Sequence, residues 1–138
     1  MKKGTLSLAI ALLAAGCVSA PVSSLTTSAN SVGGTYSCAL RELTRLNYVL
    51  LGADRDAGFI RAERKTSGGV LSVLGGADFY SEISVTVLPA TTGSGSQLRV
   101  HSTMAKDEGR GRTTRDMHNT GPAKKDADLL HAACGSAS

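Results

Sequence analysis

The sequence contains no tryptophan and few aromatic residues of any kind, with three Tyr and two Phe among 138 residues. Aromatic side chains usually contribute much of the buried area of a core, so a core here must rely on aliphatic side chains. Proline and cysteine are also scarce, at three each, whereas Gly occurs 16 times without the three-residue period of collagen. The length has room for one domain, and 41% hydrophobic residues exclude a chain that is disordered throughout.

Long hydrophobic runs are missing as well. The nearly unbroken run from Leu6 to Ala15 covers ten residues, whereas a membrane-spanning helix needs about 20. The run follows Lys2 and Lys3 and precedes small residues, the pattern of an export leader. Removing such a leader lowers the basic count from 15 to 13 against 11 acidic residues, a net charge of +2. Because a nucleic-acid-binding protein needs a concentrated basic face, we expect no nucleic-acid partner.

The end of the leader and the residue after it read Leu13-Ala14-Ala15-Gly16-Cys17, which resembles the lipobox of bacterial lipoproteins. The resemblance implies cleavage before Cys17, a diacylglycerol on its sulfur and an acyl chain such as palmitate on its amine. The commonest lipobox has Leu three residues before the cysteine, where this sequence has Ala14. The resemblance also implies sorting to the periplasmic face of the outer membrane, since Val18 stands where Asp would retain the protein. An ordinary leader cut after Ala20 is the alternative.

These features divide the chain into four parts. Residues 1–16 are the predicted signal peptide, and residues 17–34 are the lipidated cysteine and a flexible tether. The tether is predicted because Val18 to Gly34 is uncharged, rich in Ser, Thr, Ala and Gly, and without helical or strand periodicity. Residues 35–135 form the predicted domain, and residues 136–138 are a tail.

Lipidation of Cys17 leaves Cys38 and Cys134 near the two ends of the predicted domain. Two thiols in an oxidising compartment favour a disulfide. The alternatives are two free buried thiols, or a metal site that includes His131, for which further ligands are missing. Cys38 projects away from the apolar stripe of its predicted helix, so the disulfide requires Cys38 to lie at a loose helix start.

Hydrophobic periodicity predicts two helices and four strands. The first helix runs from Tyr36 to Leu46, is capped by Thr35 or Ser37 and ends at Asn47. Pro122 and Gly135 bracket a closing helix from Ala123 to Ala133. The expected strands are residues 48–51, 59–65, 82–87 and 98–104. Short connections make the strands antiparallel, so we expect an α+β two-layer sandwich in the order α-β-β-β-β-α, with both helices on one face of the sheet.

Residues 36–65 also resemble the small domains of envelope lipoproteins, including the lipoprotein of the outer-membrane β-barrel assembly machinery. The shared pattern begins with a helix, followed by a residue-Tyr pair, here Asn47-Tyr48, and a strand. An Asp-x-x-x-Gly-x-Ile turn, here Asp54-Arg55-Asp56-Ala57-Gly58-Phe59-Ile60, then leads into a second strand. The resemblance implies a non-catalytic domain that binds or supports other proteins.

Three further segments carry candidate functions. An apolar island framed by paired glycines is either a loop tip folded onto the core or a contact for lipid or a partner; it consists of Val70, Leu71, Val73 and Leu74. Lys106 to Asp116 reads as a solvated loop, with a basic stripe for headgroups or glycans as the alternative. Asp54 and Asp56 read as turn formers, and a carboxylate site that also includes Glu63 is the alternative.

No nucleophile motif, cofactor motif or metal-ligand spacing is recognisable. We therefore expect no catalytic residues, cofactor or metal. The sequence predicts a lipid-anchored envelope protein that acts as a small binding or scaffold domain, with an envelope protein as partner. The alternative function is a minor hydrolase or ligand-processing subunit with its site in the cleft between helix and sheet.

Overall fold

A computed structural model describes residues 23–66, 77–116 and 121–135. Its elements, in chain order, are β1 (Ser23–Ser28), α1 (Val32–Arg45), β2 (Val49–Asp54), β3 (Phe59–Thr66), β4 (Asp78–Pro89), β5 (Ser96–Asp107), β6 (Arg112–Asp116) and α3 (Pro122–Cys134). The protein is therefore an α+β structure, as the periodicity predicts, but two of its strands were not expected.

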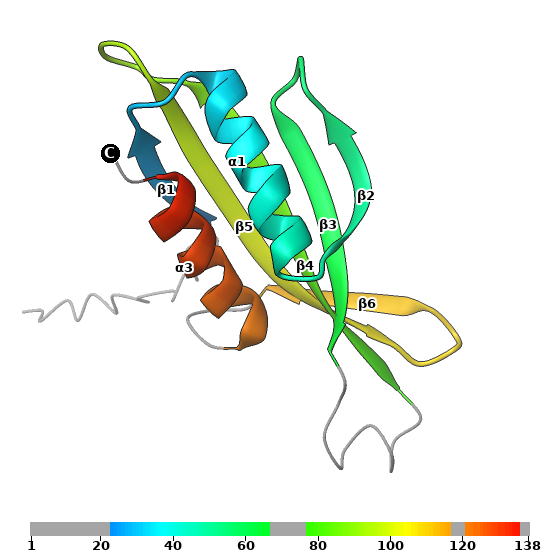
Figure 1. Cartoon of the computed structure of the whole chain (residues 1–138). Coiled ribbons are helices and arrows are strands. Elements are labelled where there is room, and N and C mark those ends of the chain that lie inside the picture. Colours follow the sequence, from blue (N-terminus) through cyan, green and yellow to red (C-terminus); the bar gives the residue numbers. More distant parts are fainter. Residues whose placement is uncertain (1–22, 67–76, 117–120, 136–138) are drawn as a thin grey trace, which may run out of the picture.

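The strands form one antiparallel sheet in the order β1-β5-β4-β3-β2, and β6 also pairs with β5. The two strands share one side of β5, because β1 pairs with residues 96–101 and β6 with residues 103–107. Both helices lie on the same face of the sheet (Figure 1), here called the helix face. The opposite face is called the open face.

Residues 23–28 correct the prediction of a flexible tether that reaches Gly34, because they form β1 on the edge of β5. The sequence SSLTTS lacks the alternation of apolar and polar residues that marks a strand. Pairing with β5 satisfies its backbone instead, so β1 owes its structure to a partner that is distant in sequence. The folded domain thus begins no later than Ser23.

Residues 106–116 correct a second prediction, since they form a β-hairpin rather than a solvated loop. β5 continues to Asp107, and β6 returns along it in register from Arg112 to Asp116. Gly109 and Gly111 both have positive φ, which lets the chain reverse between the strands.

The first helix begins earlier than predicted, because Ser31 rather than Thr35 or Ser37 is the N-cap. Ser31 Oγ accepts a hydrogen bond from the backbone N–H of Gly34 at 3.2 Å. The end is confirmed: Asn47 has φ of 61°, the left-handed conformation that Asn tolerates. The closing helix α3 is also confirmed, with Pro122 in its first turn and Gly135 as its C-cap.

The core lies between the helices and the helix face. Its fully buried aliphatic side chains come from α1, β3, β4, β5 and α3; the largest are Leu43, Ile60, Ile83, Val85, Val87, Leu98, Val100 and Leu130. The expected strand of residues 82–87 supplies three of them, so its alternating pattern was a reliable signal. Aliphatic side chains do fill this core, although Tyr36 and Tyr48 also pack into it.

Cys38 and Cys134 form a disulfide that joins α1 to α3, with Cα atoms 5.8 Å apart. Cys38 does not lie at a loose helix start, since α1 begins six residues earlier at Val32. Its direction, away from the Leu43 stripe, is explained by the packing of α3 beside α1. This second helix buries a flank that the sequence pattern alone assigned to solvent.

Candidate functional site

The predicted site residues fall into two groups. Cys17 and the apolar island, which consists of Val70, Leu71, Val73 and Leu74, lie outside the described residues. Cys38 and Cys134 are joined to each other. Candidate functional features of the described part must therefore come from its surfaces and polar clusters.

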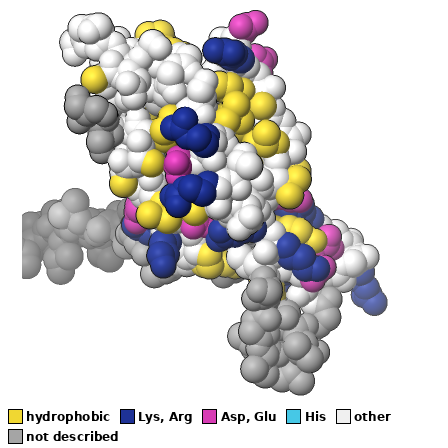
Figure 2. Space-filling model, in the orientation of Figure 1, with side chains coloured by type: hydrophobic (Ala, Val, Ile, Leu, Met, Phe, Trp, Pro, Cys, Tyr) yellow, Lys and Arg dark blue, Asp and Glu magenta, His cyan; other side chains and the backbone are white. Residues whose placement is uncertain are grey.

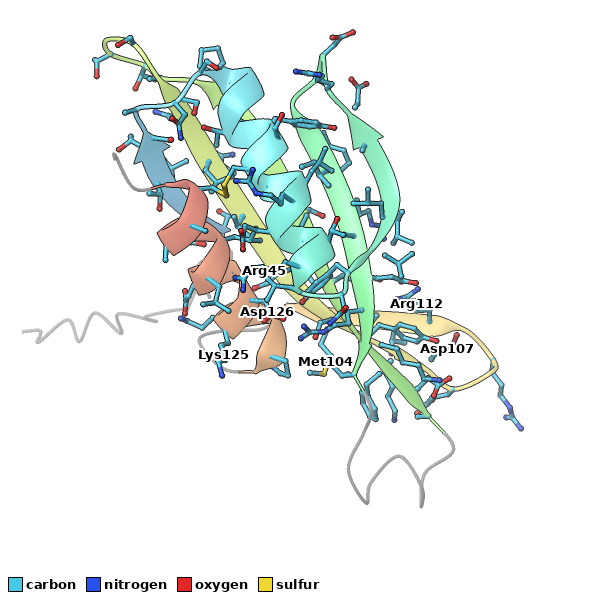
Figure 3. All side chains as sticks on the ribbon, in the orientation of Figure 1. Arg45, Met104, Asp107, Arg112, Lys125 and Asp126 are labelled. Atoms are coloured by element: carbon cyan, nitrogen blue, oxygen red, sulfur yellow. A yellow bond between two sulfur atoms is a disulfide. The ribbon has the colours of Figure 1, made fainter. Side chains whose placement is uncertain are left out.

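One polar cluster lies between α3 and the β2–β3 hairpin, where the buried Tyr48 and Asp126 meet the partly buried Arg64. Tyr48 directly precedes β2, Arg64 belongs to β3 and Asp126 to α3. Asp126 Oδ2 accepts hydrogen bonds from Tyr48 Oη at 2.9 Å and from Arg64 Nη2 at 2.5 Å. The Arg64 guanidinium also donates to the Leu46 carbonyl at 2.8 Å and lies 4.8 Å from the centroid of the Tyr48 ring. Figure 3 shows Asp126 near the start of α3, beside the C-terminal end of α1.

Burial raises the pKa of the Tyr48 phenol above its ordinary value, and the hydrogen bond to the Asp126 carboxylate raises it further. The phenol therefore keeps its proton and acts as a donor. The charges of Arg64 and Asp126 neutralise each other, so we assign this cluster a structural role. Its hydrogen bonds hold α3 against the β2–β3 hairpin.

A second cluster lies on the open face, where Arg112 of β6 reaches across the sheet to two carboxylates. Arg112 Nη2 lies 2.6 Å from Glu63 Oε2 and 2.8 Å from Glu82 Oε1, and its guanidinium lies 4.5 Å from the centroid of the Tyr80 ring. Arg61 approaches the other Glu82 oxygen at 3.4 Å. The cluster leaves Glu82 buried but paired with two cations.

The alternative carboxylate site, made of Asp54, Asp56 and Glu63, is not assembled in the structure. Asp54 accepts hydrogen bonds from the backbone N–H groups of Asp56 and Ala57, which confirms that it forms the turn. Glu63 pairs in register with Val49 at the other end of β2 and is held by Arg112. The structure therefore does not bring Glu63 together with the aspartates.

A third polar contact joins β1 to α3, where Ser24 Oγ lies 2.5 Å from His131 Nε2. Burial lowers the pKa of His131 below its ordinary value. His131 Nδ1 is buried and has no hydrogen-bond partner among the described residues. A serine–histidine pair in a hydrolase is oriented by a third group on that nitrogen, so this contact lacks the arrangement of a catalytic triad.

A pocket of about 310 Å³ lies at the end of β1 and beside the β4–β5 turn; its lining residues include Thr27, Ser28, Thr91, Ser94 and Gln97. None of its lining side chains is titratable. The pocket therefore offers hydrogen-bonding groups but no acid or base for a hydrolytic step.

The most exposed apolar element is β2, which pairs with β3 only and leaves its outer backbone edge free within the described part of the chain. All six of its residues are exposed, and Val49, Leu50 and Leu51 keep 65%, 45% and 46% of their surface accessible. A register shift between Leu50 and Gly52 makes Leu51 an extra residue in the strand. Figure 2 shows hydrophobic side chains gathered over the β2–β3 side of the molecule.

The other two edge strands have a different composition. β1 consists of Ser and Thr apart from Leu25, and β6 contains two arginines and an aspartate. Polar and charged residues on an edge discourage pairing with other chains. β2 lacks this protection from Val49 to Ala53. Its apolar sequence predicts a strand but carries no signal for the edge position, which depends on distant segments.

No protein-family model matches this sequence, and no curated protein matches it. What the domain does must therefore be inferred from its own residues. In the described part of the chain, no helix is long and apolar enough to cross a membrane.

Proposed function

We propose that this protein is an exported, lipid-anchored component of the bacterial cell envelope whose domain binds an extended segment of an envelope protein along β2. The observation that carries the binding role is the free edge of β2 with its three exposed hydrophobic residues. Proteins recognise extended segments at such edges because main-chain hydrogen bonds provide affinity while side-chain contacts provide specificity.

The anchor rests on the cysteines and on the lipobox-like sequence. A disulfide between Cys38 and Cys134 supports an oxidising compartment outside the cytoplasm. The pair also leaves Cys17 as the remaining cysteine of the chain, at the end of the leader. Two or more acyl chains on one residue hold a protein firmly on a membrane.

Replacing Cys17 by alanine is expected to abolish membrane attachment, because the lipid would have no acceptor sulfur. The measurement is intact mass and membrane fractionation of the protein from a double-membrane bacterium, with globomycin treatment as a second arm. The matched control is the paired variant Cys38→Ala/Cys134→Ala, which should still carry lipid. A Cys17→Ala product that is processed and found in the membrane fraction like the parent would refute the anchor.

A photo-crosslinking side chain in place of Leu51 is expected to join the anchored protein to one envelope protein, since Leu51 lies on the free edge. Sequencing of the crosslinked peptide should place the contact in an extended, apolar segment of that partner. The adduct should disappear when Val49→Lys adds a charge to the same strand.

The matched control carries the crosslinker at Leu129 of α3, where the native leucine is 39% exposed compared with 46% at Leu51. An adduct of the same partner from both positions would show that β2 is not the binding edge. An adduct with twice the mass of the chain would replace the proposed partner by a second copy.

A further inference from the structure

One row of residues on the open face connects β1 to β3. The register places Leu25 opposite Arg99, Arg99 opposite Thr86, and Thr86 opposite Phe59. Side chains of directly paired residues lie on the same face of a sheet. At about 4.8 Å between strands, the row spans about 14 Å from Leu25 to Phe59.

This row and the next row on the same face combine exposed apolar side chains with an exposed arginine. Leu25 is 52% exposed and Phe59 38%, and Leu88, in the next row beside Gln97, is 39% exposed. The first row contains no acidic residue from β1 to β3 and meets Asp54 of β2 beyond Phe59. The second row contains none in β1, β5 or β4. Arg99 is exposed between the apolar side chains and has no ion-pair partner among the described residues. We call Leu25, Phe59, Leu88 and Arg99 the open-face patch.

The composition of the patch suits the headgroup region of a membrane. Apolar side chains at that depth reach the acyl boundary, while an arginine pairs with phosphate oxygens. Between β1 and β3 the patch holds no carboxylate to repel anionic lipids, and Asp54 at its far end accepts two backbone hydrogen bonds. The second polar cluster keeps the nearby Glu63 and Glu82 paired with Arg112.

The short length of chain between the anchor and the domain keeps the β1 end of the open-face patch near the membrane. Ser23 begins β1 and pairs with His101, one row from Leu25 on the same face. It is the sixth residue after Cys17, and a fully extended chain covers about 3.5 Å per residue. A lipid on Cys17 therefore keeps Ser23 within about 21 Å of the anchor, much closer than a tether reaching residue 34 would allow.

We infer that the domain lies with its open face on the membrane surface, the open-face patch among the headgroups and both helices directed away. This inference rests on the proposed anchor at Cys17. It deepens the proposed function, because a partner strand at β2 then runs along the plane of the membrane rather than away from it.

The absence of tryptophan from the chain gives a direct test, since a single introduced Trp reports its own surroundings. The lipidated, full-length variants Leu25→Trp and Leu88→Trp are reconstituted in phosphatidylethanolamine–phosphatidylglycerol vesicles that contain brominated acyl chains. Quenching is expected to be roughly twice that of the control Leu129→Trp, because shallow insertion brings the patch close to the quencher. Leu129 matches Leu88 in exposure but lies on α3, in the other layer.

A charge reversal provides a second measurement without disturbing the core. Adding Arg99→Glu to the Leu88→Trp protein is expected to reduce its quenching to the level of the Leu129→Trp control, since anionic headgroups repel the new carboxylate.

The intact mass of each preparation separates the two levels of inference. Lipidated protein whose Leu25→Trp and Leu88→Trp variants are quenched no more than Leu129→Trp would overturn the orientation and leave the anchor standing. Protein without diacylglycerol on Cys17 would overturn the proposed anchor, and the orientation with it.

Discussion

Replacing Cys38 and Cys134 together by alanine is expected to lower the free energy of unfolding by about 4 kcal/mol. The two cysteines are 96 residues apart, so their bond closes a loop that includes nearly all of the domain after β1. A closed loop of this size strongly restricts the unfolded chain, and that restriction is the main source of the stabilisation in the chain-entropy model. A loss of this size is a large share of the stability of a small domain, whose total is only about 5–15 kcal/mol.

Urea unfolding followed by circular dichroism measures this change. Reductant should destabilise the parent protein by a similar amount and leave the Cys38→Ala/Cys134→Ala variant unaffected, which separates the loss of the bond from the loss of two buried sulfurs. A destabilisation below about 1 kcal/mol, or equal sensitivity of both proteins to reductant, would contradict the expected role of the bond.

The second large effect is expected from Asp126→Ala, which should destabilise the protein by about 3 kcal/mol. The substitution leaves the partly buried Arg64 guanidinium without its carboxylate and removes the acceptor of the buried Tyr48 hydroxyl. Removing one partner of a buried ion pair costs more than the pair contributes, because the remaining charge stays desolvated. Loosening of the contact between α3 and the β2–β3 hairpin should follow.

The adjacent exposed aspartate on α3 offers a matched control. Asp128 forms an ion pair with Lys124 one turn earlier on the helix, and its side chain is 57% exposed. Asp128→Ala should therefore cost less than about 0.5 kcal/mol in the same urea experiment, as exposed pairs do. Equal losses for the two variants would show that the buried cluster is not a special source of stability.

The proposed function and orientation give the two layers of the domain different tasks. The helix layer, tied by the disulfide and the buried cluster, keeps the sheet rigid. In the proposed orientation the open face meets the membrane, and the β2 edge remains accessible from the side. A partner bound at β2 would be held at the membrane surface, as a scaffold protein of the envelope requires.

Local chemistry in the sequence determined several features of the fold. Asn47, Pro122 and Gly135 marked helix ends because their backbone preferences act within a few residues. The alternation of Ile83, Val85 and Val87 identified a half-buried strand. The count of three cysteines predicted the disulfide, because Cys38 and Cys134 remain once Cys17 is assigned to lipidation.

The tertiary structure alone decided what the edges of the sheet are. β1 and β6 contain almost no apolar residues, and each becomes a strand because the long β5 offers unpaired backbone groups along one side. The run Val49–Leu51 was expected as a short strand, and it is exposed because no element of the described residues covers the edge that β2 forms. Strand pairing and edge position depend on distant segments, and no pattern within a short stretch of sequence contains them.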